Sequence, residues 1–338
     1  MAKAIALVTG AGGELGRVLI PALERKGFAI TAVDLVEPPE EIRDRCVETL
    51  CASILDREAM QGLIRRHHPE HVFHLAAILS AKAERQPHEA HRVNVEGTLA
   101  LLDVCRREPT TSGNRVRFFF PSSIAVYGLP DGATKADAGA LLETEWTVPT
   151  AVYGANKLYC ELIGSHMSRS GASEGGEIDF RSIRFPGLIS AETVPRGGTT
   201  DYAPEMIHAA ARGIAYSCFV DASARLPFMT MPDAVQATLA LATADPQQLS
   251  TRVYNIRGFS ASAGEIADET RRHFPDARIG FQVRPERQAL VDSWPADVDD
   301  GRARRDWGLA PRHGLAEALA DYLIPAIQAL YPVSGQNG

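Results

Sequence analysis

Residues 4–16 read AIALVTGAGGELG. The run Ala4–Thr9 is short and apolar, as a buried β-strand is. Gly10, Gly13 and Gly16 follow at intervals of three, and an amphipathic stretch from Glu14 to Lys26 predicts a helix that begins inside this glycine loop. The chain therefore opens with a strand, a tight glycine-rich turn and a helix.

Strand and helix patterns continue to alternate over the first half of the chain. We expect strands at Ala4–Thr9, Phe28–Val33, Val47–Leu50, His71–Leu75, Val116–Pro121 and Ile178–Arg184. We expect helices at Glu14–Lys26, Arg57–His67, His88–Arg107 and Tyr153–Arg169. Strict alternation predicts an α/β fold, a doubly wound parallel sheet covered on both faces. The run Phe118–Phe120 fits such a strand, because parallel strands are buried on both sides.

The pattern changes after Phe185–Pro186–Gly187. We expect a nucleotide-binding domain over residues 1–187, to which residues 229–256 return with a strand at Arg252–Ile256. Residues 188–228 and 257–330, with helices at Ala263–Phe274 and Leu315–Ala326, predict a smaller substrate-binding lobe. Ligands of open α/β sheets bind at the carboxyl edge of the strands, so the lobe would cover that edge. The loop Gly171–Gly176 is expected to be a surface insertion.

Composition narrows the classes of function. The net charge of −7 gives no basic footprint for nucleic acid. Five scattered cysteines without a CxxC pair indicate neither a disulfide framework nor a zinc site. No apolar run approaches the roughly 18 residues of a membrane span, and the N-terminus runs straight into a strand. We therefore expect a cytoplasmic protein that binds neither membrane nor nucleic acid.

The glycine loop predicts a dinucleotide site of the Rossmann type. A β-carbon would block close approach of a phosphate, and the N-terminus of the first helix favours an anion. The candidate contacts are Gly10, Gly13, Glu14, Leu15 and Gly16. The alternative is a glycine-rich turn without a ligand.

Two acidic residues extend this site. Asp34 ends the second strand, 18 residues after Gly16, where a carboxylate accepts both ribose hydroxyls of NAD and repels the extra phosphate of NADP. The less favoured alternative is a turn-forming aspartate. Asp56 either meets the adenine edge or caps the next helix.

Tyr153 and Lys157 share one face of a predicted helix because they stand four residues apart. A free phenol has a pKa of about 10, so only about one in a thousand is ionised at neutral pH. A nearby ammonium and a cationic nicotinamide both favour the phenolate, which could then take the proton of an alcohol. Ser123, at the end of the fifth predicted strand, could hydrogen-bond the reacting oxygen. A structural Tyr–Lys pair and an idle Ser-Ser turn are the alternatives.

A histidine-rich stretch raises the question of a metal site. The four histidines straddle a helix end, a proline and a strand, so we expect them to diverge and to bind no metal. They are His67, His68, His71 and His74.

These features together resemble the extended short-chain dehydrogenase/reductase superfamily over nearly the whole chain. The resemblance rests on the glycine loop, Asp34, His74–Ala77, Ser123 and the Tyr153/Lys157 pair. It implies that NAD also contacts Leu75, Ala76, Ala77, Asn94 and Pro186.

Finer motifs resemble the short-chain L-threonine 3-dehydrogenase family. They are residues 75–81, 121–128 and 184–190 and, above all, GGTTDYA at 197–203 and RQALVDSWP at 287–295. The likeness implies NAD-dependent oxidation of L-threonine to 2-amino-3-oxobutanoate, with Tyr153, Lys157 and Ser123 as the catalytic residues, and a homodimer built from helices His88–Arg107 and Tyr153–Arg169. It also implies substrate contacts by Ser80, Ser123, Tyr153, Gly187, Thr199, Thr200 and Asp201.

The proposed substrate is a zwitterion, which needs donors for its carboxylate and an acceptor for its ammonium. Residues 197–200 can offer donors, whereas Asp201 could accept from the ammonium or order its own loop.

Two other functions remain open at this point. A nucleotide-sugar epimerase or hydroxy-acid dehydrogenase keeps the same cofactor chemistry, and Arg284, Arg287 and Arg302 could bind a diphosphate. A third hypothesis is a sensor protein that binds NAD without turnover. Such proteins often lose the tyrosine or the lysine, and this chain has both.

Overall fold

A seven-stranded parallel sheet forms the centre of the molecule. The computed structural model describes residues 3–108, 110–113, 115–169, 178–191 and 198–331. The strand order is β11-β7-β5-β4-β1-β2-β3, and every pairing is parallel. The strands are β1 (Ile5–Thr9), β2 (Ala29–Asp34), β3 (Glu48–Cys51), β4 (His71–His74), β5 (Val116–Ser123), β7 (Ile178–Phe185) and β11 (Val253–Asn255). The predicted doubly wound parallel sheet is confirmed.

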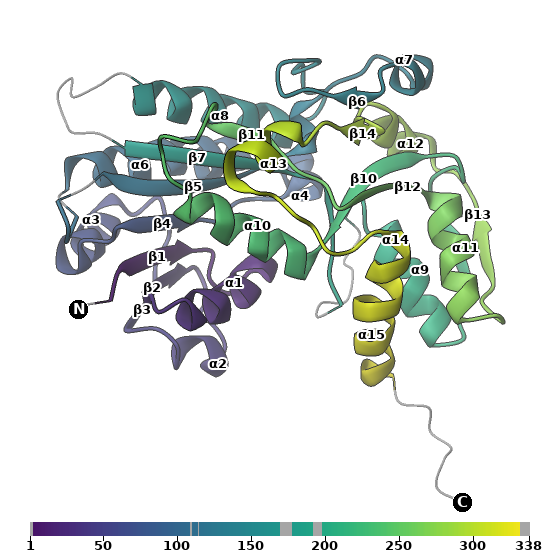
Figure 1. The fold of residues 1–338 in the computed structure, drawn as a ribbon, viewed down its shortest axis with the longest axis horizontal. Helices are drawn as coiled ribbons and strands as arrows, with labels where there is room; N and C mark the ends of the chain where they lie inside the picture. The colour runs from purple at the N-terminus through teal and green to yellow at the C-terminus, as the bar shows by residue number, and fades with distance from the viewer. Residues whose placement is uncertain (1–2, 109, 114, 170–177, 192–197, 332–338) are drawn as a thin grey trace, which may run out of the picture.

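Helices cover both faces of this sheet (Figure 1). On one face α1 (Glu14–Arg25) and α10 (Met231–Thr243) pack against Ala6 and Val8 of β1. The other face carries α3 (Arg57–His67), α6 (Gly97–Arg107) and α8 (Val152–Arg169), over the neighbouring Leu7 and over β5. Alternate residues of β1 thus enter opposite cores, as the two-residue period of a strand requires.

The predicted helix His88–Arg107 is a composite of three segments. It comprises α5 (Pro87–His91), a π-helical turn η1 (Arg92–Glu96) and α6. A β-carbon on Gly97 would lie 2.8 Å from the Cδ1 atom of Ile54, so this helix approaches the loop after β3 more closely than a larger residue would allow. The π turn also carries Asn94, one of the predicted site residues.

A second layer of smaller elements packs around its own core beside the main sheet. Its three-stranded sheet contains β8 (Gly187–Ile189), β10 (Arg225–Thr230) and β12 (Phe259–Ser262). Around it lie α9 (Tyr202–Ala211), α11 (Ala263–His273), α12 (Pro285–Asp292), β9 (Tyr216–Cys218) and β13 (Ile279–Phe281). The exact division into two domains stays a prediction.

The chain ends in α13 (Gly301–Trp307), α14 (Leu315–Glu317), the π-helical η3 (Ala318–Leu323) and α15 (Ile324–Leu330). The predicted helix Leu315–Ala326 therefore runs on to Leu330, whereas the predicted helix Ala263–Phe274 ends one residue early.

The remaining short elements are α2 (Glu40–Arg43), α4 (Ser80–Arg85), η2 (Ile124–Val126), α7 (Gly132–Asp137), β6 (Ala140–Leu141) and β14 (Asp297–Val298). The expected insertion Gly171–Gly176 lies outside the described residues.

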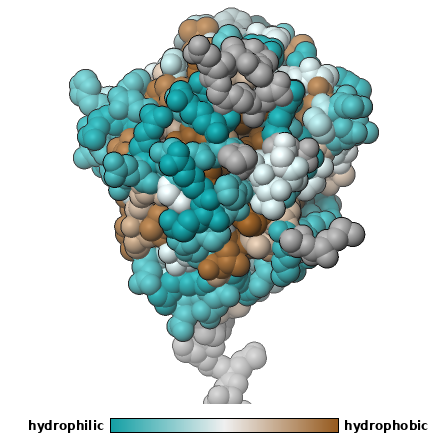
Figure 2. Space-filling model, turned by 90° about the vertical axis from the view of Figure 1, so that its left-hand side faces the viewer, coloured by the Kyte–Doolittle hydropathy of each residue, from teal (hydrophilic) through white to brown (hydrophobic). Residues whose placement is uncertain are grey.

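Hydrophilic residues cover most of the face that Figure 2 shows, and apolar residues form only small areas there. Among the helices of the described residues, none has both the length and the apolar character needed to cross a membrane.

Candidate active site

The glycine loop lies at the carboxyl end of β1 and has little room for side chains. Gly10 has a φ of +71°, and a β-carbon there would lie 2.7 Å from the backbone N of Ala76. A β-carbon on Gly16 would lie 2.6 Å from the carbonyl oxygens of Gly10 and Ala11. Gly13 is the N-cap of α1 and has no side chain to occupy the first N–H groups of that helix. Those groups, beginning with Glu14 and Leu15, are suited to an anionic ligand.

Asp34 ends β2 directly beside this loop. Its Oδ2 atom accepts a hydrogen bond from the backbone N of Gly12 at 2.8 Å, and its Oδ1 atom accepts one from Leu35 at 2.7 Å. Oδ1 also accepts from the backbone N of Val36 at 3.4 Å, whereas Oδ2 keeps a lone pair for a further donor. The carboxylate therefore tethers the glycine loop and keeps the capacity to bind ribose hydroxyls.

Asp56 takes the capping position of the next helix. Its Oδ1 atom accepts a hydrogen bond from the backbone N of Ala59 at 3.0 Å at the start of α3. Of the two roles left open for Asp56, the structure contains the helix cap. Contact with adenine stays a prediction.

A buried chain of side chains fixes the strand end that faces the glycine loop. Thr9 Oγ1 lies 2.8 Å from His74 Nδ1, and His74 Nε2 lies 2.9 Å from Thr98 Oγ1. The backbone N of Ala76 also donates to Thr9 Oγ1 at 3.3 Å. Burial, and next the charge of Lys157, lowers the pKa of His74 to about 3. His74 is therefore neutral at physiological pH and holds the 75–77 segment in place.

Asn94 acts on the same segment through both of its polar atoms. Its Oδ1 atom accepts from the backbone N of Ile78 at 2.7 Å, and its Nδ2 atom donates to the carbonyl of Ile78 at 2.9 Å. Asn94 thus shapes the turn that leads from Leu75 into α4. Ser80 is the first residue of α4, which packs against α8.

Tyr153 and Lys157 lie on α8 at the carboxyl end of β5. Lys157 Nζ donates to the carbonyl of Pro121 at 2.6 Å and lies 5.5 Å from the centre of the Tyr153 ring. Burial lowers the pKa of Lys157 to about 8, although the nearby Cys160 and Glu161 oppose this shift. The phenol and the ammonium therefore do share one face, as their spacing predicts.

A very close contact between α8 and η2 brings the start of α8 near Ser123. A β-carbon on Gly154 would lie 1.9 Å from the carbonyl oxygen of Ala125, so the start of α8 touches the backbone of η2. Ser123 immediately precedes η2, and its Oγ atom accepts from the backbone N of Ala125 at 3.1 Å. The hydroxyl remains able to donate to a ligand.

The protein alone does not acidify the phenol. Tyr153 is partly buried, and burial raises its pKa above the ordinary value of a phenol. The Lys157 ammonium is engaged by Pro121 and is not in hydrogen-bond contact with the ring. Positive charge from a bound ligand, the second of the two contributions that the sequence suggests, would oppose this rise.

The predicted substrate loop lies against the start of β8. A β-carbon on Gly187, which follows Pro186, would lie 2.7 Å from the Phe228 ring and 3.2 Å from Thr200 Cγ2. Thr199 is buried. Asp201 Oδ2 accepts from the backbone N of Gly198 at 2.6 Å, so this carboxylate orders its own loop.

The four histidines diverge, as expected. His67 pairs with Glu48 at 2.6 Å, and His68 ends α3 in the left-handed conformation. His71 packs edge-on against Phe28, and His74 belongs to the buried chain with Thr9. Within the part of the chain that the structure describes, no group of three or more acidic, histidine or cysteine side chains is placed to hold a metal ion.

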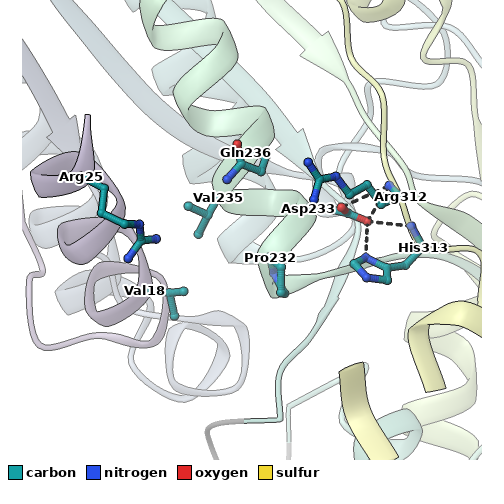
Figure 3. A pocket seen from close by; sticks show the side chains of 8 residues that line it. All are labelled: Val18, Arg25, Pro232, Asp233, Val235, Gln236, Arg312 and His313. Carbon is teal, nitrogen blue, oxygen red and sulfur yellow. Dashed lines mark hydrogen bonds and ion pairs between the residues drawn. The ribbon is translucent and has the colours of Figure 1, made fainter. Parts of the chain in front are cut away.

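A groove elsewhere on the molecule is separate from these residues. Figure 3 shows it between α1, α10 and the segment that precedes α14. Asp233 there accepts from the backbone N atoms of Arg312 and His313 and from His313 Nδ1 at 2.9 Å. It contains none of the predicted site residues, so we assign it no role in the chemistry.

Sequence reasoning missed a buried polar network behind the site. Ser122 donates to Glu161, and Glu161 pairs with Arg184 at 2.7 Å. Sequence spacing could have indicated only part of this network. Glu161 stands four residues after Lys157 and so shares its helix face, but the partners of Glu161 come from two other elements.

Comparisons with known proteins give the family and the relatives of this chain. The family model described as NAD dependent epimerase/dehydratase family matches residues 6–256. Mitochondrial L-threonine 3-dehydrogenase of Bos taurus is 33% identical over 94% of this chain and 81% of its own length. The structure of a GalE-like L-threonine dehydrogenase from Cupriavidus necator, holo form, is 35% identical with a TM-score of 0.83, over 96% of this chain and 99% of that one. A monomeric L-threonine 3-dehydrogenase from a metagenome has the same identity, coverage and TM-score.

Proposed function

Because the chain belongs to the NAD-dependent epimerase/dehydratase family, we propose that it oxidises L-threonine to 2-amino-3-oxobutanoate and reduces NAD⁺ to NADH. The observation that carries the proposal is the arrangement of Tyr153 and Lys157 on α8, against Pro121 and next to Ser123. Relatives named as L-threonine dehydrogenases, similar over nearly the whole chain, support this choice of substrate.

The fit of the cofactor is supported by the space at the glycine loop. Gly10 and Gly16 leave no room for β-carbons, and Gly13 leaves the start of α1 open, which suits a pyrophosphate. Asp34 would accept the ribose hydroxyls, and its negative charge would oppose the phosphate of NADP. When bound, NAD⁺ supplies the acceptor for the hydrogen that leaves carbon 3 of threonine as hydride.

The protein's own groups would manage the proton. Ser123 Oγ would hold the threonine hydroxyl, and the Tyr153 oxygen would take its proton as the C–O bond becomes a carbonyl. The Lys157 ammonium would favour the ionised phenol through space. One proton and one hydride leave the alcohol, which balances the oxidation to a ketone.

The substrate would lie between β8 and the loop that follows residue 197. Backbone and hydroxyl donors of Thr199 and Thr200 suit a carboxylate, and Ser80 and Gly187 complete the proposed contacts. Since Asp201 accepts from Gly198, we assign it to loop order, and its negative charge would also attract the substrate's ammonium.

A nucleotide-sugar epimerase is the competing reading, and the arginines considered for its diphosphate give it little support. Arg287 donates to the carbonyl of Gly198 at 3.2 Å and stacks on Phe219. Arg302 lies 3.5 Å from the Glu143 carboxylate. Two of the three candidate cations thus already have partners within the chain.

We further propose that the chain forms a homodimer through α6 and α8. Exposed apolar side chains on α8, Tyr159 and Leu162, support this surface. One structural relative is described as monomeric, so the oligomeric state needs its own measurement. The cytoplasmic location stays a prediction from sequence.

The test is a substrate panel read by the absorbance of NADH. Purified protein with NAD⁺ should form NADH with L-threonine and should do so far more slowly with NADP⁺. UDP-glucose and UDP-galactose are the alternative substrates, and their interconversion is followed by chromatography because an epimerase forms no net NADH. Turnover of a UDP-sugar together with no NADH from L-threonine would overturn the proposal. Binding of NADH without turnover of any substrate would instead favour the sensor.

A further inference from the structure

Three residues of α8 follow one another at intervals of four, so they share one face of the helix. They are Tyr153, Lys157 and Glu161. Lys157 Nζ donates to the carbonyl of Pro121 at 2.6 Å, and Glu161 accepts from the hydroxyl of Ser122. Successive turns of the helix thus hold successive residues of β5, and the next residue of that strand is Ser123.

Glu161 is also held from the far side by β7. Arg184 Nε donates to its Oε1 atom at 2.9 Å, and Arg184 Nη2 donates to its Oε2 atom at 2.7 Å. Glu161 is 2% exposed and Arg184 is 4% exposed. A bidentate pair at this depth fixes distance and angle as well as charge. Arg184 lies in the same strand end that leads into Pro186 and Gly187.

The remaining donors of Arg184 extend the network to other elements. Its Nη1 atom donates to Tyr127 Oη at 2.9 Å and to the carbonyl of Glu143 at 2.7 Å. Tyr127 Oη in turn donates to Asn255 Oδ1 at 2.7 Å in β11. One buried carboxylate therefore joins α8, β5 and β7, and Arg184 extends the network to Tyr127 and to β11.

A buried ion pair is a poor means of stabilising a fold, because desolvation offsets most of its attraction. Its geometric effect is the larger one here. We propose that Ser122 and Glu161 are positioning residues, which set the separation of β5 and α8 and thereby the alignment of Ser123 with Tyr153. This inference rests on the proposed function, since it concerns the rate of that same reaction.

The first test replaces Ser122 with Ala and compares it with Ser168→Ala. Ser168 is a serine of α8 that also ties this helix to the sheet, donating to the carbonyl of Ile178 at 3.0 Å and accepting from the backbone N of Phe180. Both variants lose a hydroxyl between α8 and the sheet, but Ser168 lies at the end of α8 away from Tyr153. We expect kcat to fall about tenfold in S122A and to stay within twofold in S168A, with unchanged affinity for NADH in both.

An isotope effect distinguishes misalignment from general loosening. With threonine deuterated at carbon 3, the isotope effect on kcat should rise in S122A, because a slower chemical step becomes rate-limiting. It should not change in S168A. Equal kcat and equal isotope effects in S122A and in the wild type would overturn the inference while leaving the proposed function intact. A wild-type protein that does not oxidise threonine would overturn the proposed function, and this inference with it.

The second test separates position from stability at Glu161. The single variant Glu161→Gln leaves the Arg184 charge uncompensated, so it should lower the melting temperature as well as kcat. Adding Arg184→Met removes that buried charge and should recover stability. A positioning role predicts that kcat stays at least tenfold low in the double variant. Recovery of kcat together with stability would mean that the pair only supports the fold.

Discussion

Lys157 is buried and Tyr153 is partly buried, and in both residues burial disfavours the charged form of the side chain. Desolvation lowers the pKa of Lys157 to about 8 and raises that of Tyr153 above its ordinary value. Under the proposed function, a protonated Tyr153 would not act as a base until a cationic ligand is bound. The coenzyme's positive charge would then complete the site.

The Lys157 pKa can be measured directly, because the chain has only five lysines. Lys135 is also buried, which lowers its pKa to about 8, and donates to the carbonyl of Val291. In NMR spectra with ¹³C at lysine Cε, we expect two signals to titrate near pH 8, well below the ordinary lysine value of about 10.4. Lys157→Met and Lys135→Met assign one each.

The sign of the linked stability follows from these values. Between pH 8 and about 10 the unfolded chain would hold protons that the folded chain has lost, so this pair of groups favours folding more as pH rises. Five signals that all titrate near the ordinary value would contradict the burial argument for both lysines.

Tyr153 is the residue on which turnover should depend most. Tyr153→Phe keeps the ring and removes the hydroxyl, so the proton has no acceptor at the alcohol. We expect kcat to fall by roughly 10²–10⁴, the usual contribution of general acid–base catalysis, with NADH affinity unchanged. Tyr159→Phe, an exposed tyrosine on the same helix, is the matched control. If both variants turn over at the wild-type rate, Tyr153 is not the base.

At the scale of the element, α8 approaches its neighbours through its glycines. A β-carbon at Gly154 would lie 1.9 Å from the carbonyl oxygen of Ala125, and one at Gly164 would lie 2.3 Å from the Phe180 ring. The first contact brings the start of α8 against η2, which directly follows Ser123, and the second packs the helix against the sheet. Gly154, between Tyr153 and Lys157, therefore occupies a position that no larger residue can take without moving the helix.

Gly154→Ala tests this role. The added methyl must push α8 away from η2, and such overpacking costs about 1–3 kcal/mol of unfolding free energy. We expect that loss in denaturant unfolding, together with reduced turnover. Gly62→Ala in α3 is the control: its β-carbon would come no nearer than 3.4 Å to any atom, so the variant should gain about 0.5–1 kcal/mol. A stability gain in both variants would contradict the close contact.

The same scale shows what could be predicted from sequence and what could not. The strands of the central sheet were predicted to within two residues, since most of them are short apolar runs with sharp ends. The π turn at Arg92–Glu96 was missed, because it accompanies contacts between Asn94 and Ile78 and between Gly97 and Ile54. Such contacts depend on tertiary packing, which local periodicity does not encode.

The site shows the same division. Tyr153, Lys157 and the glycine loop are local patterns, and their arrangement follows from helical spacing and from strand ends. Ser122, Glu161 and Arg184 form a unit only because β5 pairs with β7 and α8 packs over both. The order of strands in the sheet decides which of these three side chains meet. The network therefore could not be predicted from the order of residues in the chain.

For the whole molecule, the open question is which surface a second copy covers. The sheet faces are covered by helices, yet α8 leaves Tyr159 46% exposed and Leu162 63% exposed on its outer side. These two residues are three apart and lie on one face. An exposed apolar helix face is typical of a contact between proteins.

If α8 forms that contact, a charge at Leu162 should separate the copies, because burying an unpaired carboxylate is costly. We expect light scattering after size exclusion to give about twice 36.5 kDa for the wild type and 36.5 kDa for Leu162→Glu. Val47→Glu is the control, since Val47 is 61% exposed on the β3 side of the molecule, where no contact is proposed. A wild-type mass of 36.5 kDa at micromolar concentration would rule out the dimer, and would mean that α8 acts in the reaction without a partner.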